Sequence, residues 1–251
     1  MNSGKVVLVT GASQGIGAAT ARAFAEAGFR TVLAARRVEK LDEVVASFGR
    51  AGTNATAIAC DVTDPASVEA LFAKIGEQFG RIDAVFNNAG ALLPTKLVGD
   101  VTWEEWRSVV SVNLDGAFLI ASAAFRMMRD QTPQGGRIIN NGSISAYSPR
   151  YGSAPYAASK HAISGLTKSL SLDGRAFDIA CGQIDIGNAA SAMTSNMSGG
   201  GPQADGELKP EPTMDVNEVA KAVVSMAQLP LDVNVQFMTI MATKMPYIGR
   251  G

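Results

Sequence analysis

The feature that most constrains the fold of this chain is the regular alternation of short β-branched runs with longer helical patterns. The short runs are apolar almost throughout, which is typical of strands covered on both faces of a sheet. Strands separated by helices pair in parallel, and right-handed crossovers place the helices on both faces. The sequence therefore predicts an α/β fold, a single-domain doubly wound parallel sheet over residues 1–251. The predicted strands are Lys5–Thr10, Thr31–Ala35, Ala55–Cys60, Ile82–Phe86, Gly136–Ser143, Ile179–Ile184 and a last one near Val235–Ile240, and the predicted helices are Gly15–Gly28, Glu39–Arg50, Ala66–Phe79, Thr102–Arg129, Ala154–Phe177 and Val216–Leu229.

The segment from residue 189 to 213 differs in composition from the rest of the chain. Its second part, Ser198–Thr213, holds four glycines and three prolines and few apolar residues that would anchor it to a core. Such a stretch between packed elements is typical of a mobile surface loop. We therefore expect a lid over a binding site around residues 189–213, with a surface excursion that has no function as the open alternative.

Charge and composition exclude several classes of protein. The chain has 22 basic and 23 acidic side chains, so it lacks the positive field with which nucleic-acid-binding proteins neutralise phosphates. The chain has one histidine, His161, and two cysteines that are far apart in the sequence, Cys60 and Cys181. These numbers are too small for a metal site and do not favour a disulfide, so we expect all three residues to be structural. No run approaches the ~18 apolar residues of a membrane span, and no signal-peptide pattern follows Met1. We expect a cytoplasmic protein without metal, nucleic-acid or membrane partners.

A glycine-rich turn follows the first predicted strand and opens the first helix. The glycines within Thr10–Gly17 have the spacing Gly-x3-Gly-x-Gly. They allow a sharp turn that brings backbone N–H groups against a ligand, and the positive end of the helix dipole favours an anion such as a pyrophosphate. A turn that only joins a strand to a helix would look similar, but its place in the first strand-helix-strand unit favours a dinucleotide. The predicted contacts in this turn are Gly11, Ser13, Gln14, Gly15, Ile16 and Gly17.

Two arginines, Arg36 and Arg37, follow the second strand, where NAD-binding proteins place an acidic residue that holds the ribose 2′-hydroxyl. A guanidinium instead suits a 2′-phosphate, which a carboxylate would repel. We therefore predict NADP(H) as the cofactor, with Arg36 and Ser13 as the main contacts to the 2′-phosphate and Arg37 as a weaker one. The alternative is that both arginines only solubilise the start of a helix.

Tyr156 and Lys160 stand four residues apart in a predicted helix, so their side chains share one face. A phenol is a poor base at neutral pH because its pKa is about 10. A neighbouring ammonium stabilises the phenolate and lowers that pKa, which makes the pair a workable proton donor and acceptor. This spacing is common by chance, but its companions are specific: Ser143 ends the fifth strand, Asn-Asn-Ala-Gly at 87–90 follows the fourth, and Asn113 lies within a helix.

Taken together, these motifs resemble the classical short-chain dehydrogenase/reductase family, whose pattern the chain follows in order over nearly its whole length. The resemblance implies a Rossmann fold and a catalytic set of four residues. Tyr156 would protonate a carbonyl oxygen in reduction or accept the alcohol proton in oxidation, and Ser143 would hydrogen-bond the same oxygen. Lys160 would bind the ribose hydroxyls and lower the phenol pKa, while Asn113 would hold a water that links Lys160 to solvent.

The resemblance also implies further contacts to the cofactor. Asp185-Ile-Gly-Asn188 replaces the Pro-Gly turn that the family usually has after the sixth strand, although the glycine is kept. Structural alternatives stay open: Asp61 as the start of a turn, Asn113 as a link between helices, and Ser143 as a strand-end partner. The implied contacts are Asp61 and Val62 at the adenine, Asn88, Ala89 and Gly90 along the ribose, Tyr156 and Lys160 at the nicotinamide end, and Gly187 and Ser191 after the sixth strand.

The sequence therefore predicts an NADP(H)-dependent oxidoreductase that interconverts a carbonyl and a secondary alcohol on a small or medium apolar substrate. Family members are commonly tetramers, so a homo-oligomer, dimer or tetramer, is expected, although the C-terminal pattern departs from the usual one. Methionines offer an adaptable apolar surface for the substrate. The expected pocket residues are Leu92, Leu93, Tyr151, Met193 and Met197.

Two alternative functions stay open. A 3-oxoacyl thioester reductase would act on an acidic acyl-carrier protein and would need a basic rim. A non-catalytic NADP(H)-binding regulatory protein could have the same fold, because fold alone does not fix activity. The candidates for a basic rim are Arg126, Arg129, Arg150 and Arg175.

Overall fold

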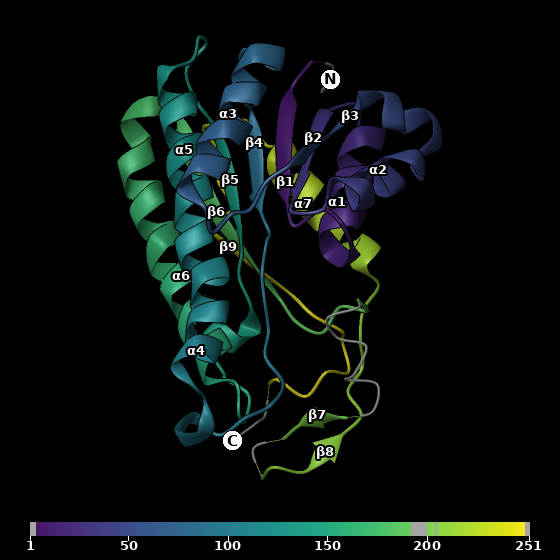
Figure 1. Cartoon of the computed structure of the whole chain (residues 1–251), viewed down its shortest axis with the longest axis vertical. Helices are drawn as coiled ribbons and strands as arrows, with labels where there is room; N and C mark the ends of the chain where they lie inside the picture. Colours follow the sequence, from purple (N-terminus) through teal and green to yellow (C-terminus); the bar gives the residue numbers. More distant parts are fainter. Residues whose placement is uncertain (1–3, 192–199, 204, 249–251) are drawn as a thin grey trace.

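The computed structural model describes residues 4–191, 200–203 and 205–248 of the chain. Within them, parallel strands form one sheet in the order β3-β2-β1-β4-β5-β6-β9, which confirms the predicted doubly wound α/β fold (Figure 1). The order reverses between β1 and β4, and open sheets of this kind bind ligands at the carboxyl ends of the strands beside such a switch point. The strands are β1 (Val6–Thr10), β2 (Arg30–Ala35), β3 (Ala55–Ala59), β4 (Ala84–Asn87), β5 (Gly136–Asn141), β6 (Ile179–Ile186) and β9 (Phe237–Ile240).

Helices cover both faces of this sheet. They are α1 (Gly15–Glu26), α2 (Val38–Ala46), α3 (Pro65–Phe79), α4 (Trp103–Val110), α5 (Ala117–Asp130), α6 (Ala154–Asp173) and α7 (Val216–Gln228). Alternate strand residues point to opposite faces. In β1, Val6 and Leu8 belong to the core shared with α3, α5 and α6, whereas Val7 and Val9 belong to the core shared with α1, α2 and α7. The strand that carries the glycine turn is therefore fixed from both sides.

The ends of β5 and β6 differ from the sequence prediction. β6 continues to Ile186, because Asp185 and Ile186 pair in register with Thr239 and Ile240 of β9. β5 stops at Asn141, and Ser143 instead caps the short 3₁₀ helix η4 (Ile144–Ala146). Both changes bring polar residues to the carboxyl edge of the sheet.

The predicted helix Thr102–Arg129 is present as one helical rod. In it a π-helical turn, η3 (Ser111–Gly116), lies between α4 and α5. The side chain of Thr102 caps its start. Such π turns insert an extra residue and often mark functional positions, and this one holds the buried Asn113. The rod, Trp103–Asp130, is long and apolar enough to cross a membrane by length and composition, but half of its apolar window is buried, as in a core helix.

The predicted lid lies partly within the described residues. Within it, β7 (Gly201–Pro202) pairs antiparallel with β8 (Leu208–Lys209) in a small hairpin, which Figure 1 shows below the main sheet, on the side away from the N-terminus. Residues 192–199 and 204 lie outside the described residues. A lid function therefore stays a prediction.

Candidate active site

A cleft of about 480 Å³ opens beside the turn between β1 and α1, at the carboxyl edge of the sheet. Among the described residues predicted to contact the cofactor, Gly187 alone is absent from the lining; its amide donates to the Ile240 carbonyl at 2.8 Å. The predicted residues that line the cleft are Gly11, Ser13, Gln14, Gly15, Ile16, Gly17, Arg36, Arg37, Asp61, Val62, Asn88, Ala89, Gly90, Tyr156, Lys160 and Ser191.

The glycine turn has the backbone geometry that its sequence predicts. Gly11 and Gly15 have φ values of 64° and 56°, in the left-handed region that favours glycine. A Cβ on Gly17 would lie 2.3 Å from the Gly11 carbonyl oxygen, so only glycine lets α1 start this close to the turn. α1 has no side-chain cap and no acidic residue in its first turn. Its free N–H groups and positive dipole end therefore face the cleft, which suits an anion.

A set of hydrogen bonds joins the ends of β1, β4 and β5 under the turn. The Thr10 hydroxyl accepts from the backbone N–H groups of Asn88 and Ala89 at 2.9 and 3.0 Å. The Asn88 amide donates to the Thr10 carbonyl at 2.9 Å and accepts from the Asn141 side chain at 2.8 Å. Asn141 also lines the cleft, and sequence reasoning missed it, although a polar residue at the end of an apolar strand marks the carboxyl edge.

The far end of the cleft carries the two arginines. Arg36 and Arg37 follow β2 and are exposed at the rim. Asp61 uses one carboxylate oxygen to accept from the backbone and hydroxyl of Thr63, at 2.9 and 2.8 Å. The Thr63 backbone hydrogen bond, with help from the charge of Arg36, lowers the pKa of Asp61. Asp61 thus starts a turn, which was the alternative to a cofactor contact, and it also lines the cleft.

Tyr156 and Lys160 lie together on the first turns of α6. The Lys160 ammonium is buried, donates to the Asn141 carbonyl at 2.7 Å and lies 5.6 Å from the centre of the Tyr156 ring. Burial lowers the pKa of Lys160 to about 8. Instead of the lowering expected from the ammonium, burial raises the pKa of Tyr156, and the groups that oppose this rise are the Ser143 side chain and Arg150.

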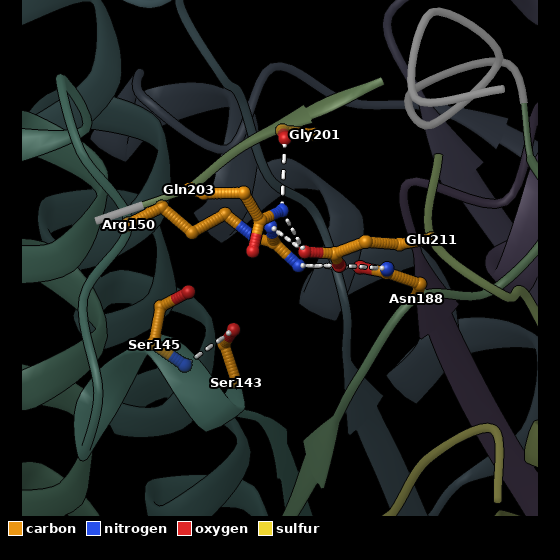
Figure 2. A network of polar contacts seen from close by, with 7 residues as sticks. All are labelled: Ser143, Ser145, Arg150, Asn188, Gly201, Gln203 and Glu211. Carbon is orange, nitrogen blue, oxygen red and sulfur yellow. Dashed lines mark hydrogen bonds and ion pairs between the residues drawn. The ribbon is translucent and has the colours of Figure 1, made fainter. Parts of the chain in front are cut away.

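Ser143 and Asn113 approach the same end of the cleft from different elements. The Ser143 side chain accepts from the Ser145 amide at 3.1 Å (Figure 2). It is also close enough to the Tyr156 phenol to oppose the rise in the pKa of Tyr156. The Asn113 amide donates to the Ala91 carbonyl and the Ser159 hydroxyl, at 3.0 and 3.1 Å, and accepts from the Ala91 amide at 2.7 Å. Asn113 therefore links the π turn both to the loop after β4 and to α6.

A buried carboxylate, Asp185, lies directly behind Ser143. It accepts from the Ser143 backbone N–H at 3.0 Å, from the Gln183 amide at 2.7 Å and from the Tyr147 hydroxyl at 3.0 Å. Sequence reasoning noted Asp185 only as a departure from the usual turn. The signal that would have found it is the pair of polar residues two apart, Gln183 and Asp185, in an otherwise apolar strand.

A buried ion pair joins the loop before α6 to the segment after β8. Arg150 donates to both carboxylate oxygens of Glu211, at 3.0 and 2.6 Å, and Asn188 and Gln203 donate to the same carboxylate at 2.7 and 2.8 Å. Figure 2 shows this network above Ser143. Arg150 was a candidate for an exposed basic rim; that assignment is wrong, because its charge is buried and matched by Glu211.

The substrate end of the site is described in part. Leu92 and Leu93 line a small hollow beside Tyr156, so their place in a substrate pocket stays a prediction, whereas Tyr151 is exposed and absent from both this hollow and the main cleft. Met193 and Met197 lie outside the described residues. The C-terminal segment, which sequence reasoning did not assign to the pocket, packs an apolar cluster behind the Ser143 turn: Ile144, Ala242 and Met245, with Met214, Met241 and Tyr247 against them.

Known proteins resemble this chain in sequence and in fold. The family described as short chain dehydrogenase matches residues 5–200. A 3beta-hydroxysteroid dehydrogenase of Mediterraneibacter gnavus is 36% identical over 194 residues, which are 77% of this chain and 69% of the relative. A sulfoacetaldehyde reductase 2 of Chromohalobacter salexigens is 31% identical over 240 residues, 95% of this chain and 94% of the relative. A solved structure of an actinorhodin polyketide ketoreductase variant with NADPH has a TM-score of 0.84 at 28% identity and covers 96% of this chain and 98% of its own.

Proposed function

This chain belongs to the short-chain dehydrogenase family, and on that premise we propose that it is an NADP(H)-dependent oxidoreductase that interconverts a carbonyl and a secondary alcohol. The observation that carries the proposal is that Tyr156 and Lys160 line the same cleft as the glycine turn and the exposed arginines, with Ser143 close enough to the Tyr156 phenol to act on its pKa. The proton donor Tyr156 and a site suited to a long, negatively charged ligand thus share one cleft.

The residues of the cleft fit a dinucleotide. The uncapped start of α1 and the close backbone approach at Gly17 suit a pyrophosphate, and Arg36 with Ser13 suits a ribose 2′-phosphate. Lys160, one turn of α6 beyond Tyr156, would bind the ribose next to the nicotinamide. When bound, the cofactor supplies or accepts the hydride.

The chain's own residues would then handle the proton and the carbonyl oxygen. Tyr156 donates its proton to the oxygen in reduction and takes it back in oxidation. Ser143 hydrogen-bonds the same oxygen and orients the carbonyl. Lys160 would bind the hydroxyls of the cofactor ribose and, with its positive charge, lower the pKa of the phenol. Asn113 keeps α6 and the loop after β4 in register, where a water linking Lys160 to solvent would sit.

A 3-oxoacyl thioester reductase is the second candidate, and it is favoured by the likeness to the polyketide ketoreductase structure. This second function is less well supported because most arginines of the expected basic rim form ion pairs within the chain. Arg126 pairs with Glu69, Arg129 with Asp130 and Arg150 with Glu211, so of the candidates only Arg175 has no such pair among the described contacts. Rates with a 3-oxoacyl thioester and with simple ketones, measured side by side, separate the two functions.

The decisive experiment compares the wild type with Tyr156→Phe. The variant should still bind NADPH, because the glycine turn, the arginines and Lys160 remain, and should lose at least about 10²-fold in kcat with the best ketone of a broad panel. A variant that keeps most of its kcat would refute the acid/base role. NADPH binding without turnover of any carbonyl by the wild type would favour the regulatory alternative. A cytoplasmic location and a homo-oligomer, dimer or tetramer, belong to the same proposal, and sedimentation of the purified chain tests the assembly.

A further inference from the structure

The carboxylate of Asp185 occupies a position that the proposed proton transfer does not use. It lies at the carboxyl end of β6, fully buried, and accepts from the backbone N–H of Ser143, whose side chain acts on the pKa of the reacting Tyr156 phenol. A Cβ on Gly142 would lie 2.1 Å from Oδ1 of Asp185, so the carboxylate is packed against the backbone of the turn that carries Ser143. The Asp185 carboxylate is therefore held both by the hydrogen bond from Ser143 and by close packing against Gly142.

Three hydrogen-bond partners surround the carboxylate of Asp185, and they favour its ionised form. The Ser143 and Gln183 donors are N–H groups and cannot accept, and the Tyr147 hydroxyl donates to the second oxygen. Gln183 is itself oriented, because it accepts from the Thr167 hydroxyl at 3.0 Å and donates to the Ser164 hydroxyl at 3.0 Å. A buried carboxylate with three oriented donors is held in one place, and these donors favour its ionised form against the opposing effect of burial.

We propose that Asp185 is a positioning residue for the reaction proposed above: its carboxylate fixes the Ser143 backbone and places a negative charge behind the Ser143 turn, within electrostatic range of the reacting hydroxyl of Tyr156. The inference rests on the proposed function, since it concerns the protonation of the same phenol. The expected consequence is a site that favours carbonyl reduction. A nearby negative charge disfavours the phenolate, so Tyr156 stays protonated and ready to donate up to a higher pH.

Other charged and titratable groups face this region, and the test must separate their effects. From α6, Lys160 and Tyr156 interact with the Asp185 charge; from the loop before α6, Arg150 acts on Tyr156 in the opposite sense. Tyr147 follows η4 and donates to Asp185, and Tyr247 of the C-terminal segment interacts with Tyr147. Burial raises the pKa of Asp185 itself, while its three hydrogen bonds and Lys160 oppose this rise.

The experiment measures kcat/KM against pH, in both reaction directions, for the wild type and for Asp185→Asn. Asparagine keeps the shape and an oxygen acceptor for Ser143 but removes the charge. Oxidation needs the phenolate and reduction needs the phenol, so the limb that reports Tyr156 should move to lower pH by at least about 0.5 unit in both directions. Asp185→Ser removes the charge with less volume and serves if the asparagine variant does not fold. Tyr147→Phe is the matched control, because it removes one hydrogen bond and leaves the charge, and its limb should stay in place.

The outcomes distinguish this inference from the proposed function. Folded Asp185→Asn and Asp185→Ser variants with an unmoved limb would overturn the inference even when Tyr156→Phe is inactive, since Asp185 would then be a purely structural group. A limb that moves equally in Tyr147→Phe would also overturn it, because loss of a hydrogen bond rather than of charge would be the cause. An active Tyr156→Phe variant would instead overturn the proposed function.

Discussion

The Arg150 guanidinium lies 2.6 Å from the Glu211 carboxylate, in an ion pair whose side chains are only 10% and 1% exposed. Arg150 precedes Tyr156 by six residues, and Glu211 follows the β7–β8 hairpin, so the pair ties this hairpin to the loop that leads into α6. Asn188, after β6, completes the network by bonding to both partners. One buried contact thus connects three segments: the loop before α6, the segment after β6 and the segment after β8.

Replacing Glu211 by glutamine should destabilise the chain strongly. The change leaves the buried Arg150 charge without its counter-charge, and breaking a buried pair in this way costs about 3–5 kcal/mol. The free energy of unfolding from urea denaturation measures the loss. The matched control is Glu218→Gln, which breaks an exposed pair with Lys221 and should stay within about 0.5 kcal/mol of the wild type. Equal losses of unfolding free energy in the two variants would contradict the inference that burial makes the Arg150–Glu211 pair important for stability.

The same pair predicts a dependence of stability on acid. Burial raises the pKa of Glu211, but the hydrogen bonds from Arg150, Gln203 and Asn188 and the charge of Arg150 outweigh it and hold the value at about 2, below the ordinary 4.5. The unfolded chain takes up this proton at higher pH than the folded chain, so the stabilisation is complete above 4.5 and is lost as the pH falls toward 2. On the order of 3 kcal/mol should disappear over this range. Glu211→Gln should lack this part of the pH dependence of the unfolding free energy.

The parts of the site that local sequence predicts are those whose geometry is local. The glycine turn follows from glycine spacing after an apolar strand, and Tyr156 with Lys160 follows from helical periodicity. Arg150 and Glu211, in contrast, are 61 residues apart, and Tyr147 and Asp185 are 38 apart. Pairings over such separations depend on how the segments pack, which no local pattern encodes.

The π turn at Asn113 shows the same limit within one helix. The sequence pattern predicts the helix from Thr102 to Arg129 but not the extra residue inserted at Ser111–Gly116. The insertion is fixed by tertiary contacts: a Cβ on Gly116 would lie 2.8 Å from the Val62 side chain, so the helix passes close to the end of β3. Helical propensity alone would continue the α-helix through this region.

Replacing Gly17 by alanine should impair cofactor binding. The added Cβ would lie 2.3 Å from the carbonyl oxygen of Gly11. This oxygen belongs to the backbone of the turn, so the turn must open or α1 must shift. We expect at least a tenfold weaker binding of NADPH, which is about 1.4 kcal/mol, and a loss of about 1–3 kcal/mol in stability. Fluorescence titration and urea denaturation measure the two effects.

The matched control for this change is Gly76→Ala in α3. An added Cβ there meets no atom within 4 Å. Alanine in an exposed helical position is favoured over glycine by about 0.5–1 kcal/mol, so this variant should be as stable as the wild type or more stable, with unchanged NADPH affinity. If Gly17→Ala behaved like Gly76→Ala, the close approach of α1 to the turn would not matter for binding.

The choice between NADPH and NADH should depend on Arg36. Its exposed guanidinium lies at the rim of the cleft, close enough to influence the carboxylate of Asp61, and a hydrogen bond from a charged group to a phosphate is worth about 1.5–3 kcal/mol. Arg36→Ala should therefore raise the Kd of NADPH by about 10- to 150-fold and leave that of NADH within a factor of about 2. Lys40→Ala, which removes an exposed positive charge from α2 where Lys40 pairs with Glu43, controls for general electrostatics and should change neither Kd by more than about twofold. Equal weakening of both cofactors by Arg36→Ala would mean that Arg36 supports the fold of the rim rather than a 2′-phosphate, and the cofactor preference would then have to be assigned to NAD(H) or to neither.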